Sequence, residues 1–457
     1  MARKKKPNGL FREAFTVFQK KGRMDLELLA IIIIMLFFGL VMVASASSVT
    51  ALYKLGDSMY FLKKQLIVAV VGFVLMIYLS KIDYHVLAKP NIVLAYMAVT
   101  WVLMLVTAFV GEDINGARRW INIGPFSLQP SELAKIGIVL LMACICSRQS
   151  KESIHSFKQG CLLYLVIIGC VCAPLLLQPH KSAMMLIGIV AMIIVIVAGA
   201  RIRNFMVFSP IVVCGLLFIM FKDKYSAARI LNFADPFKDM TGAGWQGVQS
   251  LYAIGSGGLF GLGLGRSRQK YLNIPEPQND FIFSIICEEL GFIGAALVIL
   301  LFVLLLFRCI KIAMEAPDKL GSLIAIGITA LIMVQVIINI AVVTAWMPVT
   351  GMPLPFFSAG GTSLMFTLAS MGIILNVSRQ STRAVSGVKP TYKEGKPRPA
   401  TGRNTGAPRR ASAARPAAAR APMQPRGSAY YQQAYRQAQA QRNSSGLAAR
   451  RSARYGR

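Results

Sequence analysis

Long apolar segments without charge recur along most of the chain. The run from Leu28 to Ala46, for example, contains no charged residue. About 20 apolar residues are needed to cross roughly 30 Å of hydrocarbon. The pattern therefore predicts an all-α polytopic membrane protein and not a large soluble protein with an apolar core. Ten spans are expected, near residues 26–47, 65–80, 91–110, 132–147, 160–178, 183–200, 205–221, 282–307, 320–343 and 361–377.

The charged residues are few and gather at the two ends of the chain. Charged types make up 15% of the sequence, against about 25% in a typical soluble domain. Of the net charge of +31, residues 1–25 carry +6 and residues 378–457 carry +17. Because Lys and Arg mark the cytoplasmic side, both termini are predicted to be cytoplasmic, which requires an even number of spans.

Three regions follow from this distribution. Residues 1–25 form a basic cytoplasmic N-terminus, residues 26–378 a membrane domain, and residues 379–457 a basic cytoplasmic tail. The tail is rich in Ala, Arg, Pro, Gln and Ser, which predicts disorder. Its basic residues favour anionic lipid as a partner, with a specific macromolecular partner as the alternative. No nucleic acid is expected among the partners of the chain.

The eight cysteines lie in or beside apolar runs, and none is spaced from a histidine as metal ligands are. We expect neither a metal site nor disulfides from them. The sequence also lacks a GxxxxGK[ST] phosphate-binding loop, so ATP hydrolysis is not expected.

Two outer segments are longer than a connection requires, at 111–131 and 222–281. Loops of such length are usually functional or disordered. The second, between spans 7 and 8, contains Trp245, Tyr252 and Phe260, which favours a folded extracytoplasmic loop that carries the chemistry. Its glycines between Gly255 and Gly265 predict a tight re-entrant turn; close approach of the backbone to a large ligand is the alternative.

Asp280 lies where this loop meets the apolar run of span 8. A carboxylate at that boundary is partly desolvated, which makes it a better proton acceptor near neutral pH. The alternative is an acid that only stabilises the start of a helix. Glu288 and Glu289 lie about 12 Å deeper and are expected to face a polar interior.

Polar residues inside other spans are expected to pair. Glu132 and Lys135, three positions apart, favour a structural ion pair on one helix face, with the lining of a cavity as the alternative. Gln335 and Asn339, four positions apart, suggest hydrogen bonds between helices.

A candidate substrate-binding set lies in the two outer loops. Arg118 and Arg119 precede Trp120, and a pair of cations beside an aromatic ring suits a diphosphate at the level of the lipid headgroups, or an ordinary interfacial anchor. Lys270 and Glu276 of the larger loop complete the set.

Three long strings resemble one family. They are NGARRWINIGPFSLQPSELAK (115–135), QSLYAIGSGGLFGLGLGRSRQKYLNIPEPQNDFIFSIICEELGFIG (249–294) and MPVTGMPLPFFSAGGTSLMFTLASMGI (347–373). Together they resemble the SEDS family (shape, elongation, division, sporulation), over about residues 25–378. The ARRW string leans towards the division branch, followed by the sporulation and elongation branches.

The resemblance implies an activity. Members polymerise lipid II into β-1,4 glycan strands of peptidoglycan on the outer face of the bacterial plasma membrane and release undecaprenyl diphosphate. Implied partners are lipid II, undecaprenyl-linked glycan, a class B penicillin-binding protein and other divisome proteins, with a septal location. The family's catalytic aspartate corresponds to Asp280. No cofactor is certain, and a divalent cation (Mg or Mn) is possible.

The chain departs from the family pattern at three places. It has EPQNDF at 276–281 where members often have EAHTDF, and the aspartate is kept. It has Gln178-Pro179-His180 where many have QPD, and SAGGTS at 358–363 where many have SYGGSS. No role can be transferred to His180 or to that serine segment. A lipid II flippase or other transporter, and a scaffold of the wall-synthesis complex, stay as rival classes.

Overall fold

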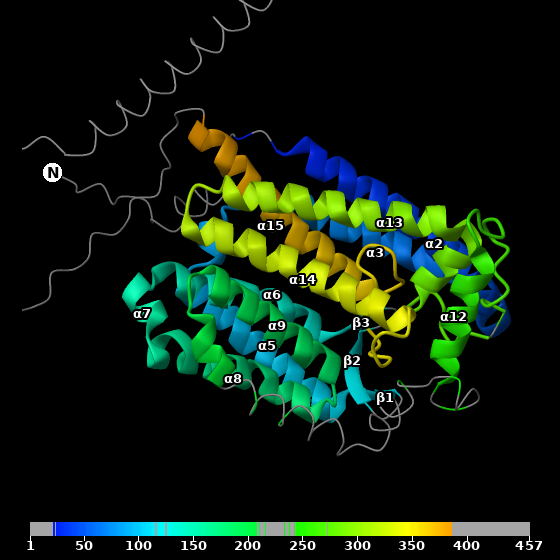
Figure 1. The fold of residues 1–457 in the computed structure, drawn as a ribbon, viewed down its shortest axis with the longest axis horizontal. Coiled ribbons are helices and arrows are strands. Elements are labelled where there is room, and N and C mark those ends of the chain that lie inside the picture. The colour runs from blue at the N-terminus through cyan, green and yellow to red at the C-terminus, as the bar shows by residue number, and fades with distance from the viewer. Residues whose placement is uncertain are drawn as a thin grey trace, which may run out of the picture. The chain divides into compact units, whose positions relative to one another are not determined.

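The computed structural model describes residues 24–385, except for 115–116, 124–125, 272 and most of 208–243; Gly22 is also described. The described chain is a bundle of helices with one small sheet (Figure 1). Its elements are α2 (Leu26–Leu55), α3 (Tyr60–Leu79), α4 (Tyr84–Leu87), α5 (Pro90–Val110), β1 (Glu112–Ile114), β2 (Ala117–Ile123), β3 (Phe126–Leu128), α6 (Pro130–Arg148), α7 (Lys151–His155), a π-helical turn η1 (Lys158–Leu162), α8 (Leu163–Leu177), α9 (Lys181–Val197), α12 (Trp245–Gly257), α13 (Ile282–Met314), α14 (Lys319–Val343) and α15 (Gly361–Val385).

Eight of these helical segments are long and apolar enough to cross a membrane, and α9 is a shorter apolar helix. They correspond to nine of the ten predicted spans. The tenth, 205–221, lies largely outside the described residues. Burial sorts the helices: 83% of the apolar stretch of α6 is buried but only 28% of that of α3 or α5. The apolar side chains that α3 and α5 leave exposed are suited to contact lipid.

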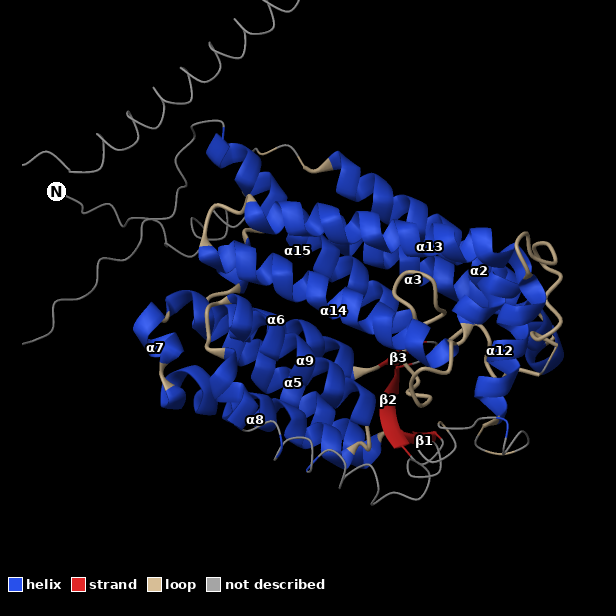
Figure 2. Cartoon of the chain, in the orientation of Figure 1, coloured by secondary structure: helices blue, strands red, loops and turns tan. Residues whose placement is uncertain are grey.

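The segment 111–131, predicted to lie on the outer side, contains three short strands, which the apolar pattern did not predict. They form an antiparallel sheet in the order β1-β2-β3, at the end of the bundle that also holds α12 (Figure 2). We name this the sheet end, and the opposite end, with α7 and the start of α2, the α7 end. Pairing gives the backbone groups of this loop hydrogen-bond partners near the membrane surface.

Helix α13 is interrupted at Gly291, where φ is 67° and ψ is −165°. The carbonyl groups of Glu288 and Glu289 accept hydrogen bonds from Leu262 N (2.9 Å) and Gly263 N (3.0 Å) of the glycine-rich loop. In return, Phe292 N donates to Gly258 O at 2.9 Å. The loop therefore supplies partners for the backbone groups that the break releases, as a membrane-embedded backbone requires.

Glycine is needed where this loop touches α13. A Cβ atom on Gly261 would lie 2.2 Å from Glu289 O, and one on Gly257 would lie 2.0 Å from Cys287 O. Gly261 also has φ of 77°, which disfavours L side chains. The expected tight turn is present, and its backbone approaches a helix of the same protein.

Charged side chains join the helices at the α7 end. Asp25 caps α2 by accepting from Leu28 N (2.9 Å), and Arg308 of α13 donates to the same carboxylate at 2.7 Å. Asp318 caps α14 by accepting from Gly321 N (2.7 Å) and also accepts from Tyr84 OH (2.9 Å). Helix caps thus serve at the same time as links between helices.

Candidate active site

Asp280 lies at the sheet end, two residues before α13, and is half-buried. The first turn of α13 has no side-chain cap and no acidic residue of its own. A carboxylate here is close to the positive end of the helix dipole. Its position between loop and membrane helix agrees with the boundary predicted from the sequence.

Asn339 of α14 fixes the backbone at Asp280. Its side-chain amide donates to Asp280 O at 2.9 Å and to Met352 O at 2.7 Å, and the residue is buried. One turn earlier, Gln335 donates to Pro353 O at 2.8 Å. The two amides therefore hold a loop and not a neighbouring helix, which corrects the helix-to-helix bonds expected from their spacing.

The loop 347–360 forms one wall beside Asp280. A Cβ atom on Gly351, where φ is 66°, would lie 3.3 Å from Oδ2 of Asp280. Ser182, at the start of α9, donates to Thr350 O at 2.5 Å. Only a residue without a side chain brings this backbone so close to the carboxylate without strain.

The loop is held at its other end as well. Gln65 of α3 donates to Ser358 O at 3.0 Å, and Ala359 N donates to Gln278 O at 2.8 Å. Farther inside, a Cβ atom on Gly39 of α2 would lie 2.1 Å from Phe356 O, so the loop descends between the helices. This anchoring gives the wall beside Asp280 a fixed position.

His180, at the start of α9, is buried beside two cations. Burial lowers its pKa well below the usual value, and the positive charges of Arg119 and Lys135 lower it further. The imidazole is therefore neutral at pH 7, and its Nδ1 atom has no hydrogen-bond partner in the described part of the chain. Arg119 reaches the same corner, where it donates to Pro179 O at 2.8 Å.

The expected ion pair of α6 is present. Lys135 Nζ lies 2.7 Å from Glu132 Oε1, and both side chains are buried. The positive charge of Lys135 also acts on His180, so the pair lies within the polar region that connects α6 with the start of α9. An ion pair and a place in the lining of a cavity are compatible here.

Lys270 has a different setting from the one expected. It is 1% exposed and its ammonium lies 2.9 Å from Glu289 Oε1. Ser45 of α2 donates to the same glutamate at 2.6 Å. Because the buried ammonium group of Lys270 is paired with Glu289, the geometry favours a structural role for Lys270 over the substrate contact predicted from the sequence.

Glu288 also faces the glycine-rich loop. It is fully buried, and its carboxylate accepts from the hydroxyl of Ser267 and from Arg268 N (2.8 Å). The expected polar interior around Glu288 and Glu289 is present, and it consists of this loop and Ser45. The two glutamates thereby hold the loop that precedes Asp280.

The other predicted substrate contacts lie near the surface. Arg118 is exposed and donates to Phe109 O at 3.2 Å, and Trp120 is half-buried on the same strand. Glu276 is exposed, with φ of 49°, and accepts from Asn279 Nδ2 at 2.8 Å. Arg118, Arg119 and Trp120 thus share β2, whereas Glu276 lies in the turn before Asp280.

Several buried polar atoms at this end have no hydrogen-bond partner among the residues that the structure describes. Buried polar groups are normally hydrogen-bonded, so a group of exceptions indicates a place for water or ligand. They include Ser131 Oγ, His180 Nδ1, Gln278 Oε1, Asn339 Oδ1, Thr350 Oγ1 and Thr362 Oγ1. The arrangement combines one carboxylate with hydroxyl, amide and imidazole groups, which suits a polyhydroxylated substrate.

No cluster of three His, Cys, Asp or Glu side chains that could hold a metal occurs among the described residues. Asp280 offers one carboxylate. A hard divalent cation there would need oxygen ligands from the substrate or water.

Sequence reasoning missed the wall beside Asp280, which is formed by Gly351, and the contact between Ser182 and Thr350 that holds it. Gly351, Thr350 and Ser182 come from segments about 70 to 100 residues away in the chain, and none of these residue types signals chemistry by itself. The signal that could have found them is the unusual density of Gly and Pro in 347–361, which is atypical of a simple connection between spans.

A family model described as "Cell cycle protein", which covers FtsW, RodA and SpoVE, matches residues 26–383. Stage V sporulation protein E of Bacillus subtilis is 42% identical over 79% of this chain and 99% of its own length. A probable peptidoglycan glycosyltransferase FtsW of Trichlorobacter lovleyi is 38% identical over 78% of this chain and 93% of its own.

Solved structures share the fold. One, of a peptidoglycan synthase complex that coordinates polymerization and crosslinking, has a TM-score of 0.66 at 27% identity and covers 78% of this chain and 98% of that chain. The rod shape determining protein RodA of Thermus thermophilus has a TM-score of 0.57 at 27% identity, covering 78% and 97%.

Proposed function

Because the chain belongs to the cell cycle protein family of FtsW, RodA and SpoVE, it is a membrane-embedded peptidoglycan glycosyltransferase, and we propose that Asp280 is its catalytic base. The observation that carries the assignment is the position of Asp280. It lies two residues before a membrane helix, its backbone is held by Asn339, and its carboxylate faces the side-chain-free backbone of Gly351.

The proposed reaction joins two lipid-linked sugars. The Asp280 carboxylate accepts the proton of the 4-hydroxyl of an acceptor lipid II, and the hydroxyl oxygen attacks the anomeric carbon of the donor. The bond from that carbon to the diphosphate breaks, and undecaprenyl diphosphate leaves. Inversion at this carbon converts an α-linked donor into a β-1,4 linkage.

The leaving group is a stable anion, so charge neutralisation is more useful to it than a general acid. Arg118 and Arg119 on β2 lie at the sheet end, as Asp280 does, and both present guanidinium groups suited to phosphate oxygens. A divalent cation, Mg or Mn, is the other proposed source of positive charge. The lipid-linked diphosphate is itself activated, so no ATP is required.

The chain is a multi-pass plasma-membrane protein, and we place both termini in the cytoplasm and the sheet end on the outer face. Its relative of known structure is described within a peptidoglycan synthase complex. We propose a class B penicillin-binding protein as the partner that cross-links the strands, other divisome proteins as further partners, and anionic lipid for the basic tail.

We propose a role in cell division at the septum. Sporulation is the second candidate. The chain is 42% identical to a stage V sporulation protein and 38% identical to the FtsW relative above, so sequence identity alone does not favour division. Fluorescent fusions of the full chain distinguish the two: septal signal in growing cells supports division, and signal confined to the forespore overturns it.

Asp280→Asn tests the catalytic assignment. Polymerisation of lipid II by the purified protein with its partner transpeptidase is expected to fall about a thousandfold, the range of a lost general base. Asp113→Asn removes an exposed carboxylate of β1 at the same end and is expected to leave the rate unchanged. Glycan products are measured on gels.

The same assay separates the rival classes. Polymer formed in detergent by wild-type protein supports the enzyme, since translocation has no meaning without a bilayer. A protein that moves lipid II in vesicles but makes no polymer would be a flippase, and one that does neither would be a scaffold. Full activity of Asp280→Asn would remove Asp280 from the mechanism.

A further inference from the structure

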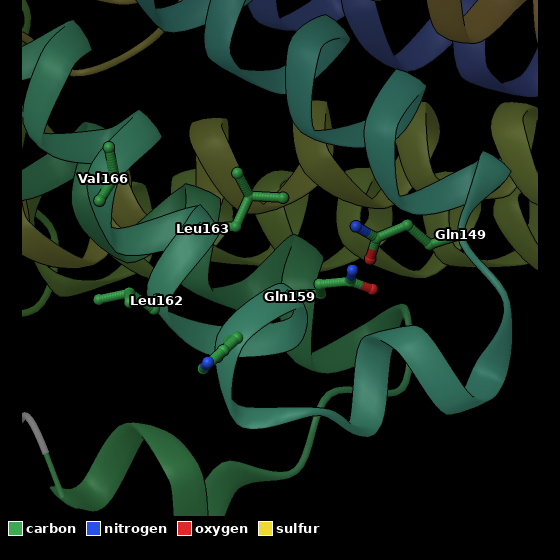
Figure 3. Close-up of a pocket in the computed structure, with 6 residues that line it drawn as sticks. Gln149, Gln159, Leu162, Leu163 and Val166 are labelled. Atoms are coloured by element: carbon green, nitrogen blue, oxygen red, sulfur yellow. The ribbon is translucent and has the colours of Figure 1, made fainter.

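A cavity of about 590 Å³ opens at the α7 end of the bundle. Figure 3 shows the side chains that line it. The cavity lies between the end of α6 and the start of α8. Six residues line it: Gln149, Lys158, Gln159, Leu162, Leu163 and Val166.

Two glutamines contribute side-chain amides to the lining of this cavity. Gln149 Oε1 accepts from Tyr164 OH at 2.8 Å, and Gln159 Oε1 accepts from Ser153 Oγ at 2.5 Å. With each carbonyl oxygen accepting a hydrogen bond from a hydroxyl of the same protein, the orientation of both amides is set. The NH₂ groups, which can only donate, remain for a ligand.

The charge of the lining is positive. Lys158 is the one charged residue among the six, and its side chain is exposed. A lysine ammonium and two amide NH₂ groups make a site that offers donors and no fixed acceptor apart from backbone. Such a set favours an anion, and phosphate oxygens in particular.

Apolar residues continue the site along the helix. Lys158, Leu162 and Val166 follow one another at four-residue spacing from η1 into α8, so that a cation is succeeded by aliphatic side chains. Leu162 and Val166 are 42% and 55% exposed. On a membrane helix, exposed aliphatic residues are suited to contact acyl chains.

We propose that this groove binds the phosphate headgroup of an anionic phospholipid, whose acyl chain lies along Leu162 and Val166. A phospholipid would use both the polar donors and the aliphatic side chains of the groove. The donors match the phosphate, and the aliphatic stripe matches the chain. A soluble phosphate compound would use the donors and leave the stripe empty.

Native mass spectrometry of the full-length protein tests the proposal, with phosphatidylglycerol and phosphatidylcholine offered at equal concentration. Lys158→Ala is expected to retain about tenfold less phosphatidylglycerol than wild type, because one charge-assisted contact is lost. Leu162→Ser is expected to weaken retention less. Lys311→Ala, an exposed lysine on α13, is the control that removes the same charge elsewhere.

Preferential loss in Lys158→Ala with retention in Lys311→Ala supports the site. Equal losses in the two variants would reduce the effect to overall charge and overturn it. Equal retention of phosphatidylcholine would overturn the anionic preference. Displacement of phosphatidylglycerol by an equal concentration of sn-glycerol 3-phosphate would assign the groove to a soluble phosphate and overturn the lipid.

Discussion

The two ends of the bundle are fastened in different ways. At the α7 end, charged side chains pair across helices: Arg308 with Asp25 and Glu27, and His85 with Asp83 and Asp318. At the sheet end, side-chain pairs such as Lys270 with Glu289 are joined by extensive backbone packing at glycines, as at Gly257 and Gly261 against α13.

Residues with strained backbone and buried polar atoms without hydrogen-bond partners are also concentrated at the sheet end. The described non-glycine residues with positive φ are Pro179, Glu276, Ala345 and Phe356, and all belong to the sheet end or to the loop that descends from it. Buried polar atoms without partners gather there too. Strained backbone and unsatisfied groups are characteristic of functional sites, because a site must keep hydrogen-bonding capacity for its substrate.

The largest expected effect tests the backbone packing of the sheet end. Gly261→Ala places a Cβ atom 2.2 Å from Glu289 O at a positive φ and is expected to cost about 3 kcal/mol of stability. Thermal unfolding in detergent measures it. Gly265→Ala, at φ of 79° but with no atom within 4 Å, is the matched control and should cost about 1 kcal/mol. Equal losses would show that φ, and not packing, sets the cost.

The next effect concerns catalysis. Gly351→Ala is expected to lower lipid II polymerisation about a hundredfold, because a methyl group 3.3 Å from Asp280 Oδ2 displaces the carboxylate. Gly56→Ala, at φ of 73° with open space around it, is the control and should retain the rate. Wild-type activity in Gly351→Ala would mean that this wall does not confine the carboxylate.

The smallest effect tests the α7 end. Burial lowers the pKa of His85, but the hydrogen bonds that its ring donates to Asp318 and Asp83 outweigh this effect and raise the pKa from 6.5 to about 9. The protonated form is therefore stabilised by folding. This contribution is complete below pH 6.5 and is lost as the pH rises through 9.

His85→Gln should accordingly lower stability by about 1 kcal/mol at pH 6, after allowance for solvent screening, and by less at pH 10. Melting temperatures across this range measure the trend. His155→Gln removes an exposed histidine of α7 and serves as the control. A deficit that does not change with pH would mean that shape, and not charge, matters at His85.

Much of the fold could be predicted because apolar runs report directly on membrane helices. Nine of the ten spans have matching helices, and the pairing of Glu132 with Lys135 follows from helical spacing. The strands β1 to β3 could not be predicted in this way, since each has seven residues or fewer and gives no usable period.

The surroundings of Asp280 were only partly predictable. Its own position follows from the boundary between the loop and the apolar run, and its role came from the resemblance. The bonds of Asn339 to Asp280 O and Met352 O join residues far apart in sequence, and a polar residue inside a span does not reveal its partner. The buried ion pair of Lys270 with Glu289 could not be predicted either, because the sequence does not show which residue of α13 the loop lysine contacts.

The position of the loop 347–360 late in the sequence also determines when, during synthesis, the surroundings of Asp280 can form. Asp280 is synthesised before Asn339 and Gly351, so a nascent chain that has just emitted α13 carries the carboxylate without the elements that orient it. Asp280 can be oriented only after the loop 347–360 has been translated and has packed against α2 and α14. We therefore expect an unfinished chain in the membrane to lack polymerising activity.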